Sequence, residues 1–304
     1  MPLPALTRLL VLSALWGASF LFMRITAPEL GAFSTAFFRV LFGTIGLIAI
    51  LAALRVPWNF RGKAGAALLI GVVNSRIPFA MFSLAAQVLP AGYSAMFNAT
   101  TPLMGLLIGA VLFAEPLTCE RVIGVGFGLV GVGVLVQMGP VPLSTSLLLG
   151  ALACLIAASG YGLAGFLVKR FITDRGGLDS RLLALGSQIG ASLALAPWML
   201  AETATRESHG AWTQLNIWAA MLVLGLACTS LAYLLYFRLL QDLGPVKPLT
   251  VTMLVPLFGV FWGALFLDET ITFAHALGGL LIAIALWLIL FKKNSTLDVS
   301  KRGR

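Results

Sequence analysis

Long apolar runs separated by short polar breaks fill almost the whole chain. Five runs lie at about 7–26, 31–53, 64–87, 91–113 and 119–138, and five more at about 146–168, 180–200, 214–237, 246–267 and 273–291. Each run is near the roughly 20 residues that an α-helix needs to cross the hydrocarbon core of a bilayer. Strands of a membrane barrel would instead alternate apolar and polar residues. The pattern predicts an all-α membrane protein with ten transmembrane helices.

Composition supports a lipid environment. Of the 304 residues, 60% are hydrophobic and 10% are charged, whereas a soluble domain has about 25% charged residues. In lipid, backbone groups must bond within the segment, which favours helices. The breaks between runs carry turn-forming pairs such as Gly139-Pro140, Gly176-Gly177 and Gly244-Pro245.

The distribution of Lys and Arg predicts an orientation. With both termini in the cytoplasm, sixteen of the 20 basic residues fall in cytoplasmic segments, and Arg206 alone falls on the other side. Positive charge concentrates on the cytoplasmic side of membrane proteins. We therefore expect a multi-pass protein of the inner (plasma) membrane. The net charge of +9 then reflects membrane topology, so the expected surroundings are the lipid bilayer and no nucleic acid.

The two halves of the chain repeat each other. An offset of 154 residues pairs Pro102 with Pro256, Gly105 with Gly259, Gly109 with Gly263, Glu115 with Glu269 and Gln87 with Gln241, and an offset of 145 pairs Trp16 with Tyr161 and Arg24 with Lys169. Because five helices per repeat is an odd number, the second copy enters the membrane upside down. Inverted repeats are typical of secondary transporters. The predicted units are residues 1–140 and 141–292, followed by a basic cytoplasmic tail at 293–304.

Four motifs stand at defined positions in these helices. They are Trp16-Gly17-Ala18-Ser19-Phe20 in the first run, Asn74-Ser75-Arg76-Ile77-Pro78-Phe79 in the third, Asn98-Ala99-Thr100-Thr101-Pro102 in the fourth, and Glu115 with Leu117-Thr118 before a glycine-rich fifth run. Together they resemble the EamA-type permeases of the drug/metabolite transporter superfamily, over nearly the whole chain. The resemblance implies an inverted repeat, a central cavity and export of small metabolites, amino-acid-like or drug-like. Thr252 replaces Asn98 in the second half, which indicates an asymmetric site.

Three arginines lie inside apolar runs. Arg76 is near the middle of the third run, where a charge costs about 2.5–3.5 kcal/mol on insertion scales. Pro78 cannot bond to the carbonyl of Asn74, so this stretch offers a guanidinium, an amide and a free carbonyl. The alternative is that Arg76 only stabilises a bend. For Arg39 both roles, solute binding and stabilising a bend, stay open. Arg24 is expected to reach the lipid headgroups. No acidic residue lies deep in any run, which leaves carbonyls, water or an anionic solute as partners.

The predicted solute site lies at mid-membrane depth between the halves. Its residues are Trp16, Arg39, Asn74, Arg76, Asn98, Tyr161 and Tyr233. Arg76 is expected to hold an anionic group, and Asn98 to take hydrogen bonds because Pro102 leaves its carbonyl free. The aromatic residues pack against an apolar body; simple helix packing is the alternative interpretation of such a stripe.

Other chemistry is not indicated. No HExxH, GxSxG or Walker A sequence is present, and three cysteines and two histidines without metal-binding spacing predict no metal or other cofactor. An enzyme is not expected; a membrane-embedded enzyme or a sensor without a recognisable motif is the alternative. Glu115 and Glu269 precede Thr118 and Thr272 and are expected to cap the fifth and tenth helices, with gating as the other possibility.

Overall fold

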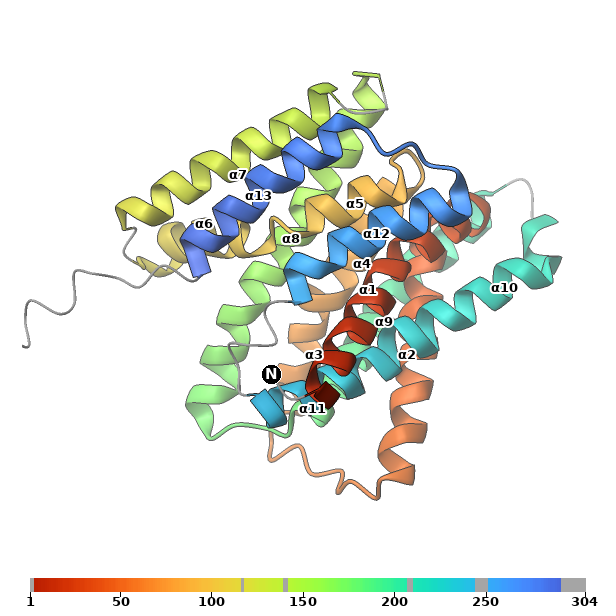
Figure 1. Cartoon of the computed structure of the whole chain (residues 1–304). Helices are drawn as coiled ribbons and strands as arrows, with labels where there is room; N and C mark the ends of the chain where they lie inside the picture. Colours follow the sequence, from red (N-terminus) through yellow and green to blue (C-terminus); the bar gives the residue numbers. More distant parts are fainter. Residues whose placement is uncertain (1–2, 116–117, 139–141, 207–209, 244–250, 291–304) are drawn as a thin grey trace, which may run out of the picture.

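The computed structural model describes residues 3–115, 118–138, 142–206, 210–243 and 251–290 (Figure 1). Every regular element in these ranges is helical, which confirms the all-α prediction. The helices of the first half are α1 (Leu3–Leu30), α2 (Ala32–Ala53), α3 (Ala64–Gly71), η1 (Val72–Arg76), α4 (Ile77–Ala86), α5 (Ala91–Asn98), α6 (Thr101–Phe113) and α7 (Cys119–Met138). Those of the second half are α8 (Thr145–Phe171), η2 (Thr173–Arg175), α9 (Ser180–Thr205), η3 (Gly210–Thr213), α10 (Leu215–Leu222), η4 (Val223–Leu231), α11 (Ala232–Leu243), α12 (Val251–Leu267) and α13 (Phe273–Leu290).

Seven helical segments are long and apolar enough to cross a membrane. They are Leu3–Leu30, Ala32–Ala53, Ala64–Ala86, Ala91–Phe113, Thr145–Arg175, Ser180–Thr205 and Leu215–Tyr236. Two shorter apolar helices, Leu254–Leu267 and Phe273–Ala285, follow. The chain therefore has the helices of a multi-pass membrane protein. The predicted tail at 293–304 lies outside the described residues.

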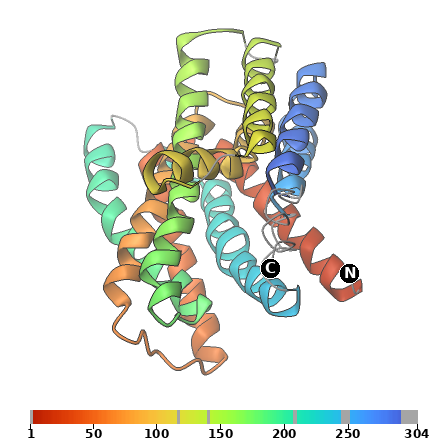
Figure 2. The ribbon, with the colours of Figure 1, turned by 90° about the vertical axis from the view of Figure 1, so that its left-hand side faces the viewer.

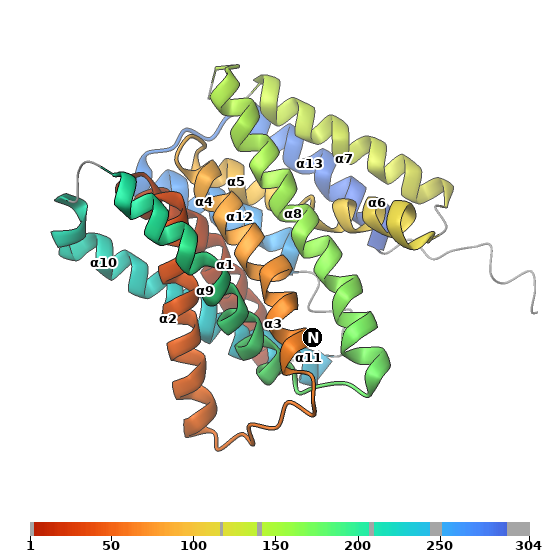
Figure 3. The ribbon, with the colours of Figure 1, turned by 180° about the vertical axis from the view of Figure 1, so that it is seen from behind.

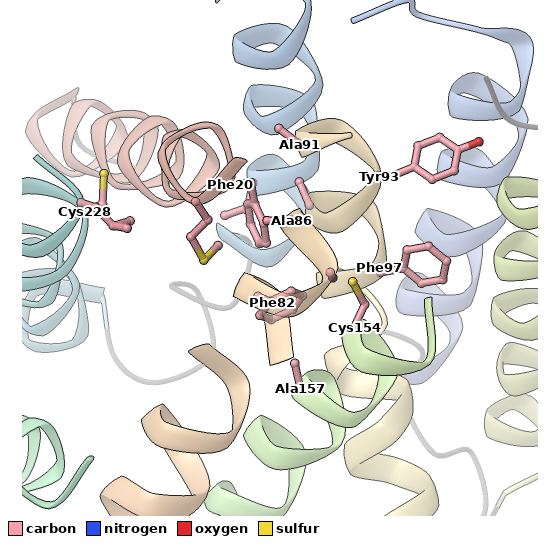
Figure 4. Packing of buried hydrophobic residues seen from close by; sticks show 14 of the residues in the cluster. Phe20, Phe82, Ala86, Ala91, Tyr93, Phe97, Cys154, Ala157 and Cys228 are labelled. Carbon is pink, nitrogen blue, oxygen red and sulfur yellow. The ribbon is translucent and has the colours of Figure 1, made fainter. Parts of the chain in front are cut away.

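The two halves interleave. Helix α1 packs along α12, α2 along α9, and α7 along α13, while α8 contacts α4 and α6 (Figures 1 and 3). Figure 2 shows α7 and α13 side by side from a second direction. The largest cluster of buried apolar residues draws side chains from both halves, including Phe20, Phe82, Cys154 and Cys228 (Figure 4). Neither half has a separate core.

Glycines allow the closest helix approaches. A Cβ atom on Gly162 of α8 would lie 2.7 Å from the Cα of Gly105 in α6. A Cβ on Gly259 of α12 would lie 2.3 Å from the Cβ of Ala95 in α5. Such contacts are possible only between small residues, as in other membrane helix pairs. They hold the walls of α5, α6, α8 and α12 close together.

The third and eighth apolar runs each contain a π-helical segment. Segment η1 lies between α3 and α4, and η4 lies between α10 and α11. The offset of 154 places residues 72–76 on 226–230, inside η4. Single π-helical turns within α-helices frequently occur at functional sites. Both segments pack beside α2 or α9 at the centre of the molecule.

The two repeat-related prolines have different effects. At Pro102 the chain breaks between α5 and α6, and the amides of Ala99 and Thr100 bond to carbonyls three residues back. The hydroxyl of Thr101 donates to the Asn98 carbonyl at 2.7 Å, so the carbonyl predicted to be free has a partner. Helix α12, in contrast, continues through Pro256.

Candidate functional site

A cavity of about 610 Å³ lies between the two halves of the chain. The cavity is lined by residues from α1, α2, α3, η1, α4, α8, α9, η4, α11 and α12, together with the break between α5 and α6. Small-molecule sites are typically clefts of about 300–1,000 Å³ with apolar walls and a few polar groups. The size and composition of this cavity therefore suit a small organic solute.

The structure brings six of the seven predicted site residues to this cavity. They are Trp16, Arg39, Asn74, Asn98, Tyr161 and Tyr233. The ring of Trp16 lies 5.5 Å from the ring of Tyr236, centroid to centroid, and Tyr236 also lines the cavity. The site combines an aromatic wall with one guanidinium and two side-chain amides.

Arg39 is the charged residue of the cavity. It is 5% exposed, and its guanidinium carbon lies 3.8 Å from the centre of the Phe79 ring. Its Nε donates to Thr229 Oγ1 at 3.3 Å, and its Nη1 lies 3.3 Å from the Met23 sulfur. No carboxylate among the described residues forms an ion pair with it. A guanidinium has five N–H donors, so Arg39 retains capacity for an anionic group.

Arg76 does not line the cavity, contrary to the sequence prediction. It is partly buried, and its guanidinium carbon lies 5.3 Å from the ring centre of Trp198 in α9. Trp198 is 49% exposed on the outer surface. The prediction assumed a regular helix, but Arg76 is the last residue of η1, where bonds to the fifth residue back change which way successive side chains point.

A polar network supports the cavity wall beside Arg39. The sequence prediction missed two of its members, Gln188 and Thr229. Gln188 of α9 is fully buried and donates from Nε2 to Ser75 Oγ at 2.9 Å. The Tyr233 side chain lies against Asn74, Ser75 and Gln188. Thr229, which binds Arg39, donates to the Leu224 carbonyl at 3.0 Å. Gln188 lies deep in the apolar run 180–200, so the depth criterion that singled out Arg76 would also have found it.

Aromatic rings and hydrogen bonds close one end of the cavity. Phe20 and Phe82 (Figure 4) meet edge to face with ring centroids 5.3 Å apart. The ring centroid of Phe82 lies 6.3 Å from that of Tyr161. Beyond these rings, Arg24 Nη1 donates to the carbonyls of Ala86 at 2.7 Å and Gln87 at 3.0 Å. Its charge stabilises the carbonyl end of α4, and its contact with the headgroups stays a prediction.

Two glutamates join helices at the same end. The Glu269 carboxylate accepts the amides of Ala91 at 2.6 Å and Gly92 at 3.1 Å. Glu269 therefore caps α5, whereas the sequence predicted that it caps the helix that follows it. Thr272 at that helix bonds instead to His275 Nδ1. Glu202, which the sequence prediction missed, accepts the amides of Ala32 at 2.9 Å and Ser34 at 2.8 Å, at the start of α2.

The opposite end of the cavity reaches helix termini. Its lining includes Val168 near the end of α8, Ser180 at the start of α9 and Val251 at the start of α12. Lys169 and Glu115 are exposed. The cavity thus extends to the end of the molecule that carries the loop between α8 and α9.

The described residues contain no group of three His, Cys, Asp or Glu side chains that could hold a metal ion. Cys154 and Cys228 are buried and free. The chemistry that this cavity offers is reversible binding through one cation, amides, hydroxyls and aromatic faces.

A multi-pass helical protein with a solute-sized cavity between two interleaved halves has the architecture of a membrane transporter. Residues 4–137 and 148–291 both match the EamA-like transporter family, and the chain belongs to that family. The resemblance to the drug/metabolite transporter superfamily is thereby confirmed.

Several curated proteins are similar over most of their length. Protein PecM of Dickeya dadantii (strain 3937) is 27% identical, covering 90% of this chain and 88% of PecM. A probable amino-acid metabolite efflux pump of Escherichia coli (strain K12) is 22% identical, covering 93% of each chain. The uncharacterized transporter YoaV of Bacillus subtilis (strain 168) is 22% identical over 91% of this chain and 93% of its own. A crystal structure that is 19% identical covers 99% of both chains with a TM-score of 0.59 and supports the fold. The relatives' names point to a transporter, not an enzyme.

Proposed function

We propose that the protein exports small organic solutes that carry an anionic group and an apolar or aromatic body, including amino-acid-like and drug-like molecules. Arg39 carries this proposal, because it is a buried cation in the cavity without a carboxylate partner in the described chain. Burying an unpaired charge is costly, and an anionic solute would complete its coordination. The name of the Escherichia coli relative, an amino-acid metabolite efflux pump, agrees with a solute of this kind.

The remaining site residues have distinct roles in this proposal. Asn74 and Asn98 hydrogen-bond polar groups of the solute, while Trp16, Tyr161 and Tyr233 pack against its apolar body. Arg76 is not part of the proposed site, because it lies against Trp198. Arg39 takes the role that the sequence assigned to Arg76.

The proposed mechanism is alternating access between two inverted repeats, residues 1–140 and 141–292. In this proposal α7, α12 and α13 complete a set of ten spans. Repeat-related contacts support it: α2 packs on its counterpart α9, and α7 packs on its counterpart α13. Both termini are in the cytoplasm of a cell whose inner (plasma) membrane holds the protein, according to the distribution of Lys and Arg. The end of the cavity near Val168 and Ser180 then opens to the cytoplasm.

A ligand panel on purified protein tests the solute class. Pairs of compounds with the same aromatic body but a carboxylate in one member and an amide in the other are compared by the shift in melting temperature. A ligand that binds only the folded state stabilises it by RT ln(1 + L/Kd), where L is the ligand concentration, so tighter binding at the same concentration gives a larger shift. We expect the carboxylates to stabilise the protein and the amides to have little effect. Equal stabilisation by amides, or by amines, would overturn the proposed solute class.

Orientation is tested separately by labelling with a membrane-impermeant thiol reagent in whole cells. A cysteine at Gly177, introduced in a variant without Cys119, Cys154 and Cys228, is expected to stay unlabelled. Labelling from outside would contradict the proposed topology.

A further inference from the structure

The closed end of the cavity is held by three polar side chains from both halves of the chain, which we call the outer clamp: Arg24, Gln87 and Glu269. Arg24 binds the last carbonyls of α4, and Gln87 Nε2 donates to the Ala27 carbonyl of α1 at 3.1 Å. Glu269 binds the first two amides of α5. A polar recess of about 420 Å³, lined by these three side chains, lies outside the clamp.

The contacts of the outer clamp cross between mobile parts of the proposed transporter. Arg24 and Gln87 tie α1 to α4, and Glu269, which follows α12, ties the second half to α5. Charge-assisted hydrogen bonds to helix ends are stronger than neutral ones. These contacts hold α1, α4, α5 and the end of α12 together on the side of the cavity where Phe20 and Phe82 lie.

Every member of the outer clamp has a counterpart in the sequence repeat. Arg24 corresponds to Lys169, Gln87 to Gln241 and Glu269 to Glu115. The outer clamp has two residues from the first half of the chain and one from the second. The counterpart set has one from the first half and two from the second. In an inverted repeat, the counterparts belong at the opposite end of the cavity.

In this structure the side chains of Lys169 and Glu115 do not form a clamp with described residues. Lys169 and Glu115 are exposed, and no hydrogen bond or ion pair joins either side chain to another described residue. Val168, next to Lys169, lines the end of the cavity that reaches the helix termini. Positions 245 and 246, which correspond to Ala91 and Gly92, lie outside the described residues. The outer end therefore has its polar contacts made, whereas Lys169 and Glu115 at the other end make none with described residues.

We propose that Lys169, Gln241 and Glu115 form an inner clamp, and that the outer and inner clamps close in alternation to set which end of the cavity is open. The inference rests on the proposed alternating access and adds the residues that control it. The outer clamp stabilises the state seen here, and the inner clamp stabilises the state that opens to the outside. Weakening one clamp shifts the population toward the state held by the other.

The test measures conformation and needs no solute. Ser19, which lines the cavity behind Phe20 and is 4% exposed, is changed to Cys in the variant without native cysteines. An impermeant thiol reagent is then added outside whole cells. Glu269→Gln should raise the labelling rate of this cysteine several-fold, and Glu115→Gln should lower it. The double change should return the rate toward that of the parent, because the two effects oppose each other.

Controls separate the clamps from general damage and from local charge. Looser folding would raise labelling in both single variants, so a rise in Glu115→Gln overturns the proposal, as does an unchanged rate in Glu269→Gln. Glu29 lines the same recess without a bond in the described structure, and Glu29→Gln should leave the rate unchanged. If Glu29→Gln raises the labelling rate as much as Glu269→Gln does, the effect comes from the charge of the recess, and the clamp proposal is overturned. If the ligand panel fails but the two variants still shift labelling in opposite directions, the solute class is refuted and the clamps are not.

Discussion

Two arginines that lie inside apolar runs have opposite surroundings. Arg39 is 5% exposed, faces the cavity and lies over Phe79. Arg76 is partly buried beside Trp198, whose ring is half exposed on the outer surface. An arginine within a membrane span is costly to insert. The depth of a charge therefore indicates that it has a purpose, whereas only its neighbours indicate which purpose.

The largest expected effect is at Arg39. Arg39→Ala should reduce the affinity for a carboxylate ligand about 10- to 100-fold, because a hydrogen bond to a charged group is worth about 1.5–3 kcal/mol. Arg39→Lys keeps the charge but loses the planar fork and should give an intermediate value. Binding is measured by calorimetry on folded protein. If the carboxylate binds Arg39→Ala as tightly as it binds the parent protein, Arg39 is a packing residue, and the contrast with Arg76 does not hold.

A smaller effect is expected at Gln188, which supports the Arg39 side of the cavity. Gln188→Leu has similar volume but removes the hydrogen bond that Gln188 donates to the buried Ser75 hydroxyl, which is worth about 1 kcal/mol. Chemical unfolding in detergent should show this loss. Ser192→Ala is a suitable control, because Ser192 bonds only to the Gln188 carbonyl and Thr44. Equal losses in both variants would indicate no special role for Gln188.

Arg76 should contribute to stability and little to transport. Arg76→Ala removes a cation–π contact with Trp198, worth about 0.5–1 kcal/mol at a partly exposed site. Uptake by proteoliposomes should stay within about twofold of the parent, since a loss of this size leaves most protein folded. Trp198→Leu removes the same contact together with the stacking of Trp198 on Phe33, so it should lose more stability than Arg76→Ala. Abolished uptake in well-folded Arg76→Ala would restore the sequence-based assignment.

The smallest effect is expected at a third arginine, which has a carboxylate partner outside the membrane spans. Hydrogen bonding to Arg181 lowers the pKa of Asp179 below its ordinary value of 3.8. Asp179 also caps α9 by accepting the Arg181 amide at 2.9 Å. A lowered pKa contributes stability above the ordinary value that is lost as pH falls through the folded-state value. Because the pair is mostly exposed, the loss should be about 0.5 kcal/mol or less. Asp179→Asn should unfold with a flatter pH dependence below pH 4; an unchanged profile would exclude this linkage.

The sequence predicts the helices well because lipid imposes a simple pattern. The apolar run 31–53 corresponds to α2 (Ala32–Ala53), and 146–168 to α8 (Thr145–Phe171). Apolar composition does not distinguish α- from π-helical bonding, so η1 and η4 could not be predicted. Proline was an ambiguous guide, since Pro102 breaks a helix and Pro256 does not.

The sequence predicted the site residues that can be recognised by residue type and position in a motif. Trp16, Tyr161 and Asn98 were found from the repeat and the family motif, and all line the cavity. The partners of Arg24 and Glu269 depend on which helices pack together over long sequence separations, and periodicity contains no such information. Arg76 was misplaced for a local reason, the π-helical turn that ends at it.

The charge of the cavity has a consequence for the driving force. Arg39 is the one charged side chain among the described residues that line it, and it stays in α2 while a solute passes. If the proposed solute carries one negative charge and moves without a coupled ion, its export transfers net charge across the membrane. Each elementary charge moved across the membrane is worth about 2.3 kcal/mol per 100 mV. With the cell interior negative, that voltage alone can sustain a roughly 50-fold higher anion concentration outside.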